Sequence, residues 1–266
     1  MKSPTELENN KALRAFSQLL VMMGELREKC PWDQRQTMES LRHLTIEETF
    51  ELSEAILEGD IGDIKKELGD LLLHIVLYTL IATEQRSFTI TNVIQALCEK
   101  LIHRHPHIYG QEKVENEQAV KQNWEKRKLQ EKGNQSVLGG VPHTLPSLIK
   151  AMRIQEKVSM IGFGCPDSKS AWQEAQEKIQ VLMQKNSQHP PTPTQHKRAQ
   201  EEFGTLLFSL VNYARFIEIN PEEALEKANK KFIQEFQHIE QQVINEGKQI
   251  TQLSTAELMS YGKATN

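Results

Sequence analysis

The chain has 266 residues, of which 32 are basic and 36 acidic, and its formal net charge is −4. This length suits one large or two smaller domains, and the balance of charge argues against stable nucleic-acid binding. The N-terminal stretch MKSPTELENN lacks the apolar core of a secretory signal, and no apolar run approaches the roughly 20 residues that span a bilayer. Three cysteines, Cys30, Cys98 and Cys165, are too few for a disulfide framework. A cytoplasmic protein without a membrane partner is therefore expected.

Helical periodicity dominates the sequence, and we find no alternating strand pattern of useful length. The first helix is expected over 5–29, where a Cys-Pro pair breaks it. Helices over 45–58 and 61–84 follow, separated by a short glycine-containing turn. The remaining helices are expected at 90–104, 115–131, 145–159, 169–186, 196–217, 221–246 and 254–261. The pattern predicts an all-α fold in which short turns make neighbouring helices antiparallel.

Two pairs of acidic residues occupy the helices at 45–58 and 61–84. Glu48 and Glu51 are three residues apart, as are Glu67 and Asp70, so each pair shares a helix face. If the two helices pack antiparallel, four carboxylates converge with no obvious protein cation between them. Such a cluster takes up protons or is neutralised by a metal ion. A donor set of oxygens alone favours Mg2+, with Mn2+ as the alternative.

Helix capping is the competing interpretation of the same residues. Thr45 with Glu48 fits a capping box, and Asp60 is placed to cap the next helix. The surroundings of Glu67 and Asp70 favour the metal, because a largely apolar helix draws an acidic residue toward the core. A di-iron bundle is disfavoured, since neither acidic pair has the histidine that its Glu-x-x-His motif requires.

The chain repeats this helical frame about 130 residues later with most of the acids replaced. The equivalent positions are Glu48 and Lys178, Glu51 and Val181, Glu67 and Glu202, and Asp70 and Thr205. Lysine and valine offer no oxygen to a hard cation, so we expect the first copy to carry the chemistry. The predicted division is a module over 1–112 with the intact acidic motif, a charged connector over 113–140, and a module over 141–266 with the degenerate motif.

These motifs resemble, in order and over nearly the whole chain, the MazG family of nucleoside triphosphate pyrophosphohydrolases. The matching segments are Cys30-Pro-Trp-Asp33, Glu47-Glu48-x-x-Glu51, Glu67-Leu-Gly-Asp70, Arg104-His-Pro-His107, Gly140-Val-Pro142, Ile161-Gly-Phe163 and Ala228-Asn-Lys-Lys-Phe232. The resemblance implies tandem four-helix-bundle modules that assemble as a homodimer. It also implies Mg2+-dependent hydrolysis of a nucleoside triphosphate to the monophosphate and diphosphate.

The resemblance further implies roles for single residues. Glu48, Glu51, Glu67 and Asp70 look like the metal ligands, and Glu47 looks like an auxiliary carboxylate for a further metal or the attacking water. Two basic residues, Lys100 and Arg104, match the positions that hold phosphate in the family. Trp32 either stacks on a base or lies in a core or dimer interface. Lys65 and Lys66 either approach the triphosphate or form a solvated face.

The degenerate second copy leaves another class of function open. Family members with two modules can carry the acidic motif in both halves, and this chain has lost one. The alternative is a helical regulatory or nucleotide-binding protein with weak or absent catalysis, although the intact first cluster argues against it. The sequence leaves the nucleotide open among common triphosphates, damaged triphosphates, dUTP and an alarmone, because it identifies no residue that contacts the base.

Overall fold

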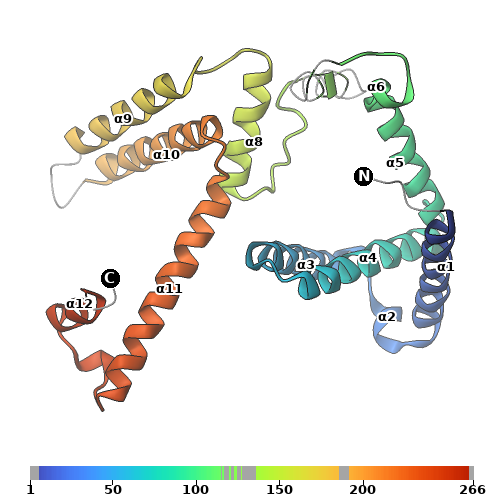
Figure 1. The fold of residues 1–266 in the computed structure, drawn as a ribbon, viewed down its shortest axis with the longest axis horizontal. Coiled ribbons are helices and arrows are strands. Elements are labelled where there is room, and N and C mark those ends of the chain that lie inside the picture. The colour runs from blue at the N-terminus through green and yellow to red at the C-terminus, as the bar shows by residue number, and fades with distance from the viewer. Residues whose placement is uncertain are drawn as a thin grey trace. The chain divides into compact units, whose positions relative to one another are not determined.

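The computed structural model describes residues 6–114, 116, 120, 123–124, 127, 136–185 and 192–263. Every regular element in these ranges is helical, which confirms the predicted all-α fold (Figure 1). The chain divides into two compact units, Met1–Lys113 and Val114–Asn266. The predicted helix at 115–131 falls largely outside the described ranges.

The first unit is built around a helical hairpin. Its helices are α1 (Glu6–Lys29), α2 (Pro31–Arg35), α3 (Met38–Glu58), α4 (Ile61–Glu84), α5 (Ile90–Arg104) and α6 (Pro106–Tyr109). In Figure 1, α3 and α4 run side by side as an antiparallel pair, and α1 packs against α4. The predicted bounds of the helices at 61–84 and 90–104 are confirmed.

The second unit repeats the hairpin and extends it. Its helices are α8 (Ser147–Met160), α9 (Ser168–Lys185), α10 (Pro193–Phe216), α11 (Pro221–Asn245), the short 3-10 helix η1 (Ile250–Gln252) and α12 (Thr255–Lys263). The α9–α10 pair corresponds to α3–α4, α8 contacts α10 and α11, and α12 folds back onto α11. The frame that repeats in the sequence is therefore a repeated helical hairpin.

The predicted start of the helix at 45–58 is wrong, because α3 begins seven residues earlier, at Met38. Thr37 caps this helix: its side chain accepts a hydrogen bond from the Ser40 backbone N–H, and the Ser40 hydroxyl accepts one from the backbone N–H of Thr37. A short helix, α2, fills the proline-broken segment before it, with Pro31 as its first residue. Proline suits that position because the first N–H of a helix has no intrahelical partner.

The capping interpretation of Thr45 and Glu48 is also wrong, since both lie inside α3. The Thr45 hydroxyl donates to the backbone carbonyl of Leu41 and lies 2.8 Å from the Tyr78 hydroxyl. The second contact joins α3 to α4 less than one turn before Glu48. With the capping role removed, Glu48 needs another explanation.

The turn between α3 and α4 determines how the acidic residues meet. Gly59 ends α3 with φ of 72°, a left-handed conformation that glycine adopts without a Cβ clash. Asp60 then caps α4 by accepting hydrogen bonds from the N–H groups of Gly62 (2.8 Å) and Asp63 (3.0 Å), as predicted. A connection of only two residues makes the helices antiparallel neighbours.

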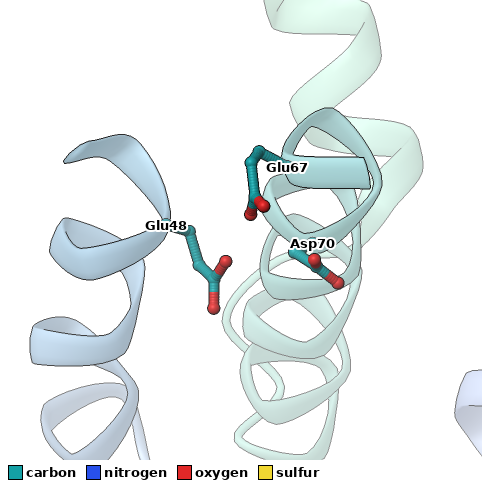
Figure 2. Close-up of side chains that lie close together, drawn as sticks. All are labelled: Glu48, Glu67 and Asp70. Carbon is teal, nitrogen blue, oxygen red and sulfur yellow. The ribbon is translucent and has the colours of Figure 1, made fainter. Parts of the chain in front are cut away.

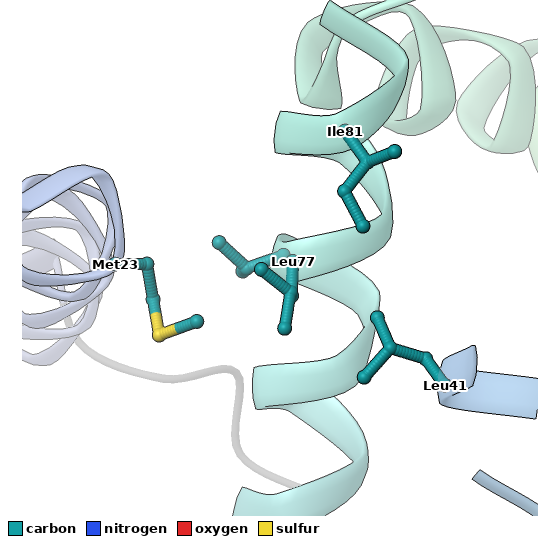
Figure 3. Close-up of a cluster of buried hydrophobic side chains, with 5 residues drawn as sticks. Met23, Leu41, Leu77 and Ile81 are labelled. Atoms are coloured by element: carbon teal, nitrogen blue, oxygen red, sulfur yellow. The ribbon is translucent and has the colours of Figure 1, made fainter. Parts of the chain in front are cut away.

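A hydrophobic cluster holds the hairpin together on the C-terminal side of the acidic residues of α4. Leu41 of α3 and Leu77 of α4 have no exposed surface, and Met23 of α1 closes over them (Figure 3). Val76 and Ile81 complete the cluster, so the core occupies the C-terminal half of α4. Burial of these side chains sets the rotation of α4 about its axis and hence the face that carries its acids.

An ion pair anchors the far end of α4. The Arg27 guanidinium donates to both carboxylate oxygens of Glu84, at 2.7 and 2.8 Å, and also to the backbone carbonyls of Asp33 and Gln36. These bonds tie α1, α2 and the last turn of α4 together. The hydrogen bond to Glu84 raises the pKa of Arg27, so the guanidinium stays charged.

Candidate metal centre

Three carboxylates meet across the α3–α4 hairpin. Glu48 extends from α3 toward α4, which carries Glu67 and Asp70 one turn apart (Figure 2). One oxygen of each residue lies within 4.8 Å of one oxygen of the other two. The three residues are called the acidic cluster below. Oxygen ligands at this separation suit a single hard divalent cation.

Glu67 is the most buried member of the acidic cluster, with 4% of its surface exposed. Its Oε1 atom accepts a hydrogen bond from Lys66 Nζ at 2.8 Å, whereas its buried Oε2 atom has no hydrogen-bond partner. The expectation that no protein cation enters the cluster is therefore wrong. The Lys66 ammonium is mostly exposed, and its hydrogen bond to Glu67 raises its pKa. One lysine leaves the second oxygen unsatisfied, which is costly for a buried acceptor and suits a metal ligand.

The negative charge of the acidic cluster affects the pKa of Glu48. Burial raises the pKa of this carboxyl, and the negative charges of Asp70, Glu51 and Glu67 raise it further. A carboxyl whose pKa is higher in the folded protein binds more protons when folded. Ionisation of Glu48 therefore opposes folding. This destabilisation begins as the pH rises above about 4.5, the ordinary pKa of the group, and is complete above the raised pKa.

Replacing Glu48 with glutamine is accordingly expected to stabilise the protein without metal. We expect the Glu48→Gln melting temperature in chelator to rise by about 1–3 °C near pH 8, because the amide removes a repelling charge. The gain should shrink near pH 5, where wild-type Glu48 is partly protonated. Thermal unfolding at both pH values measures this, with exposed Glu47→Gln on the same helix as the control. A lower melting temperature for Glu48→Gln at both pH values would contradict the repulsion.

Glu51, the fourth predicted ligand, lies outside this group of three. Its side chain is exposed on α3, although its charge reaches Glu48. With Glu47, one turn away, it lines an open pocket of about 380 Å³ that also includes His43 and Phe50. The structure thus brings together three of the four predicted ligands. Glu51 is exposed but near enough to act on Glu48, and Glu47 is exposed one turn before Glu51 on α3.

The remaining predicted residues lie on other helices of the first unit. Trp32 on α2 is half exposed, so it is not a core residue of this unit. Lys100 and Arg104 lie on α5, the first exposed and the second at the last helical position. Contact of these three side chains with a nucleotide stays a prediction.

His74 is the residue near the cluster that the sequence interpretation missed. It follows Asp70 by one turn of α4 and is 94% buried, and its Nδ1 atom has no hydrogen-bond partner. Burial lowers the pKa of His74, while the negative charge of Asp70 opposes that effect. The available signal was the four-residue spacing from Asp70, which places both on one face.

Comparison with known proteins identifies the family of this chain. The MazG nucleotide pyrophosphohydrolase domain matches residues 36–109, which include the whole α3–α4 hairpin. A Thermotoga maritima protein named nucleoside triphosphate pyrophosphohydrolase/pyrophosphatase MazG is 40% identical over 92% of this chain and 93% of its own. The chain belongs to the MazG family. A nucleoside triphosphate pyrophosphohydrolase of Escherichia coli K12 is 34% identical over 90% of this MazG chain and 92% of its own. The resemblance predicted from the motifs is thereby confirmed.

Within the described residues of α9 and α10, this MazG protein has no acidic cluster equivalent to that of the first hairpin. Glu202 of α10 accepts a hydrogen bond from Arg198, and the Thr205 hydroxyl donates to the Glu201 backbone carbonyl. Among the described residues, the acidic cluster of the first unit is the one group of three potential ligands. Nor does any described helix have the length and apolarity needed to cross a membrane.

Proposed function

We propose that this MazG protein hydrolyses nucleoside triphosphates to the monophosphate and diphosphate at the acidic cluster of its first unit. The observation that carries the proposal is the convergence of Glu48, Glu67 and Asp70, one of which has a buried oxygen without a partner. The names of the Thermotoga maritima and Escherichia coli relatives support the substrate class. The replaced acids of the second hairpin support the assignment of catalysis to the first unit.

The chemistry of the donors fits Mg2+, with Mn2+ as the alternative. Carboxylate oxygens are the ligands that both ions prefer. A bound ion would also satisfy the buried Glu67 oxygen that has no hydrogen-bond partner. Glu48, Glu67 and Asp70 would hold the ion, with Glu51 as a further ligand. When bound, Mg2+ supplies positive charge against the roughly four negative charges of a triphosphate and polarises a phosphoryl oxygen.

The other predicted residues act on the substrate and the water in this proposal. Glu47 or Glu51, exposed beside the cluster, accepts a proton from the water that attacks the α-phosphorus. Lys100 and Arg104 share one face of α5 and bind the phosphates. Trp32 stacks on the base or joins a dimer interface.

A homodimer is part of the proposal because the first unit leaves apolar helix faces exposed. None of the α5 residues is buried, and α4 exposes an apolar stripe next to its acids. The exposed apolar side chains are Leu68, Leu72 and Ile75 on α4 and Val93, Ile94, Leu97, Leu101 and Ile102 on α5. Stripes of this kind at helical spacing are usually covered by another helix. The three free cysteines fit the reducing cytoplasm in which we place the protein.

Product identification tests the function. Full-length protein is incubated with each common triphosphate, dUTP and an alarmone in Mg2+, and the products are separated by anion exchange. We expect monophosphate and diphosphate in equal amounts for the triphosphate substrates. Release of the nucleoside diphosphate and inorganic phosphate would place the attack at the γ-phosphorus and contradict the proposal. Nucleotide binding without turnover would favour the regulatory alternative.

A further inference from the structure

We infer that His74 is a positioning residue for Asp70, holding its carboxylate in place by a hydrogen bond from the imidazole when an ion occupies the cluster. The inference rests on the proposed metal site and assigns a role to a side chain outside the ligand set. Its starting point is the buried Nδ1 atom of His74, which has no hydrogen-bond partner and lies one helical turn after Asp70. Buried polar groups in native proteins are nearly always paired, so an exception needs a cause.

The geometry of α4 directs His74 toward the cluster. Glu67, Asp70 and His74 occupy positions i, i+3 and i+7 and therefore lie along one face of the helix. Helical side chains lean toward the N-terminus of their helix, which points His74 toward Asp70 and away from the core. On the other side, Val76 and Leu77 begin the hydrophobic cluster. The imidazole thus lies between the acids and the core.

His74 is not itself a member of the group of candidate ligands. That group contains Glu48, Glu67 and Asp70, whose oxygens lie within 4.8 Å of one another, and it includes no histidine nitrogen. A neutral imidazole still has one N–H to donate, and an aspartate that binds an ion with one oxygen has another oxygen to accept it. Such outer partners orient metal ligands and account for part of the affinity of the ion.

A purely structural role explains the same residue less well. A histidine kept only for packing would be replaceable by leucine, which has a similar volume and no polar atom to bury. In the described part of the chain, His74 Nδ1 makes no hydrogen bond, and the nearby cluster members Val76 and Leu77 are apolar. The two roles therefore differ in metal affinity: a packing role leaves Mn2+ binding unchanged in His74→Leu, whereas the positioning role weakens it.

The test is Mn2+ binding by the full-length protein, measured by the electron paramagnetic resonance signal of the free ion, together with thermal unfolding in chelator. We expect His74→Leu to weaken Mn2+ binding by about 10-fold or more while its melting temperature stays at or above that of the wild type. We expect His74→Gln, whose amide can donate to Asp70, to stay within about 3-fold of wild-type affinity. Val76→Ala is the matched control, expected to lower the melting temperature without changing Mn2+ affinity.

Two results would overturn the role of His74 while leaving the proposed metal site intact. One is wild-type Mn2+ affinity in His74→Leu, and the other is an equal loss of affinity in both His74 variants accompanied by a lower melting temperature. If the wild-type protein binds no Mn2+, the metal site fails, and the inference fails with it. Diphosphate release and Mn2+ binding by the wild type therefore separate the failure of the proposed function from the failure of the role of His74.

Discussion

Glu67→Gln is expected to reduce diphosphate release by about 100-fold or more, the largest effect of any single substitution in the chain. The amide keeps the shape of the side chain but removes the charge of the most buried carboxylate in the acidic cluster. Initial rates of diphosphate release at saturating Mg2+ measure the loss. An unchanged melting temperature shows that the fold is retained.

The chain provides its own control for this substitution. Glu202 occupies the equivalent position on α10, where it accepts a hydrogen bond from Arg198 instead of joining an acidic cluster. Glu202→Gln is expected to retain activity close to that of the wild type. If Glu202→Gln abolishes turnover and Glu67→Gln does not, catalysis belongs to the second unit and the assignment to the first is wrong.

Removal of divalent cations is expected to abolish activity. With excess chelator, diphosphate release should fall by about 100-fold or more, and added Mg2+ or Mn2+ should restore it. Without an ion, three carboxylates face the roughly four negative charges of a triphosphate, and the ion pair of Lys66 with Glu67 offsets one carboxylate charge. Full activity in chelator after exhaustive dialysis would exclude the metal-dependent mechanism.

The helices should survive this treatment. The hairpin is held by the Asp60 cap, the left-handed Gly59 and the hydrophobic cluster, none of which includes a member of the acidic cluster. Circular dichroism in chelator is therefore expected to match the spectrum in Mg2+. This control distinguishes loss of the ion from loss of the fold.

Local sequence signals were sufficient for much of the hairpin. The bounds of α4 follow from Asp60 at its start and from the end of its apolar periodicity near Glu84, and both are local features. The start of α3 was missed because Thr37 and Thr45 both fit a cap, and spacing does not choose between them. The choice depends on α2 and on the Tyr78 contact that places Thr45 inside the hairpin.

Helix periodicity predicts which site residues share a helix face, but it does not predict how that helix is rotated toward its neighbours. Spacing placed Glu67 and Asp70 on one face of α4, but periodicity on α3 does not show whether Glu48 or Glu51 turns toward α4. Packing of the hydrophobic cluster decides that rotation. The burial of His74 could not be predicted for the same reason, since the side chains that cover it are brought there by the tertiary fold. Contacts of Lys100 and Arg104 depend on what covers the exposed face of α5.

The unpartnered oxygen of Glu67 also links ion concentration to the lifetime of the protein. In the proposed site, folding creates a binding site that the unfolded chain lacks, so free ion shifts the folding equilibrium by mass action. Each tenfold rise in free Mg2+ above the dissociation constant adds about 1.4 kcal/mol to the free energy of unfolding. A drop in Mg2+ would then slow turnover and, with the helices still formed in most molecules, raise the small unfolded fraction that proteases cleave, lowering the amount of enzyme along with its rate.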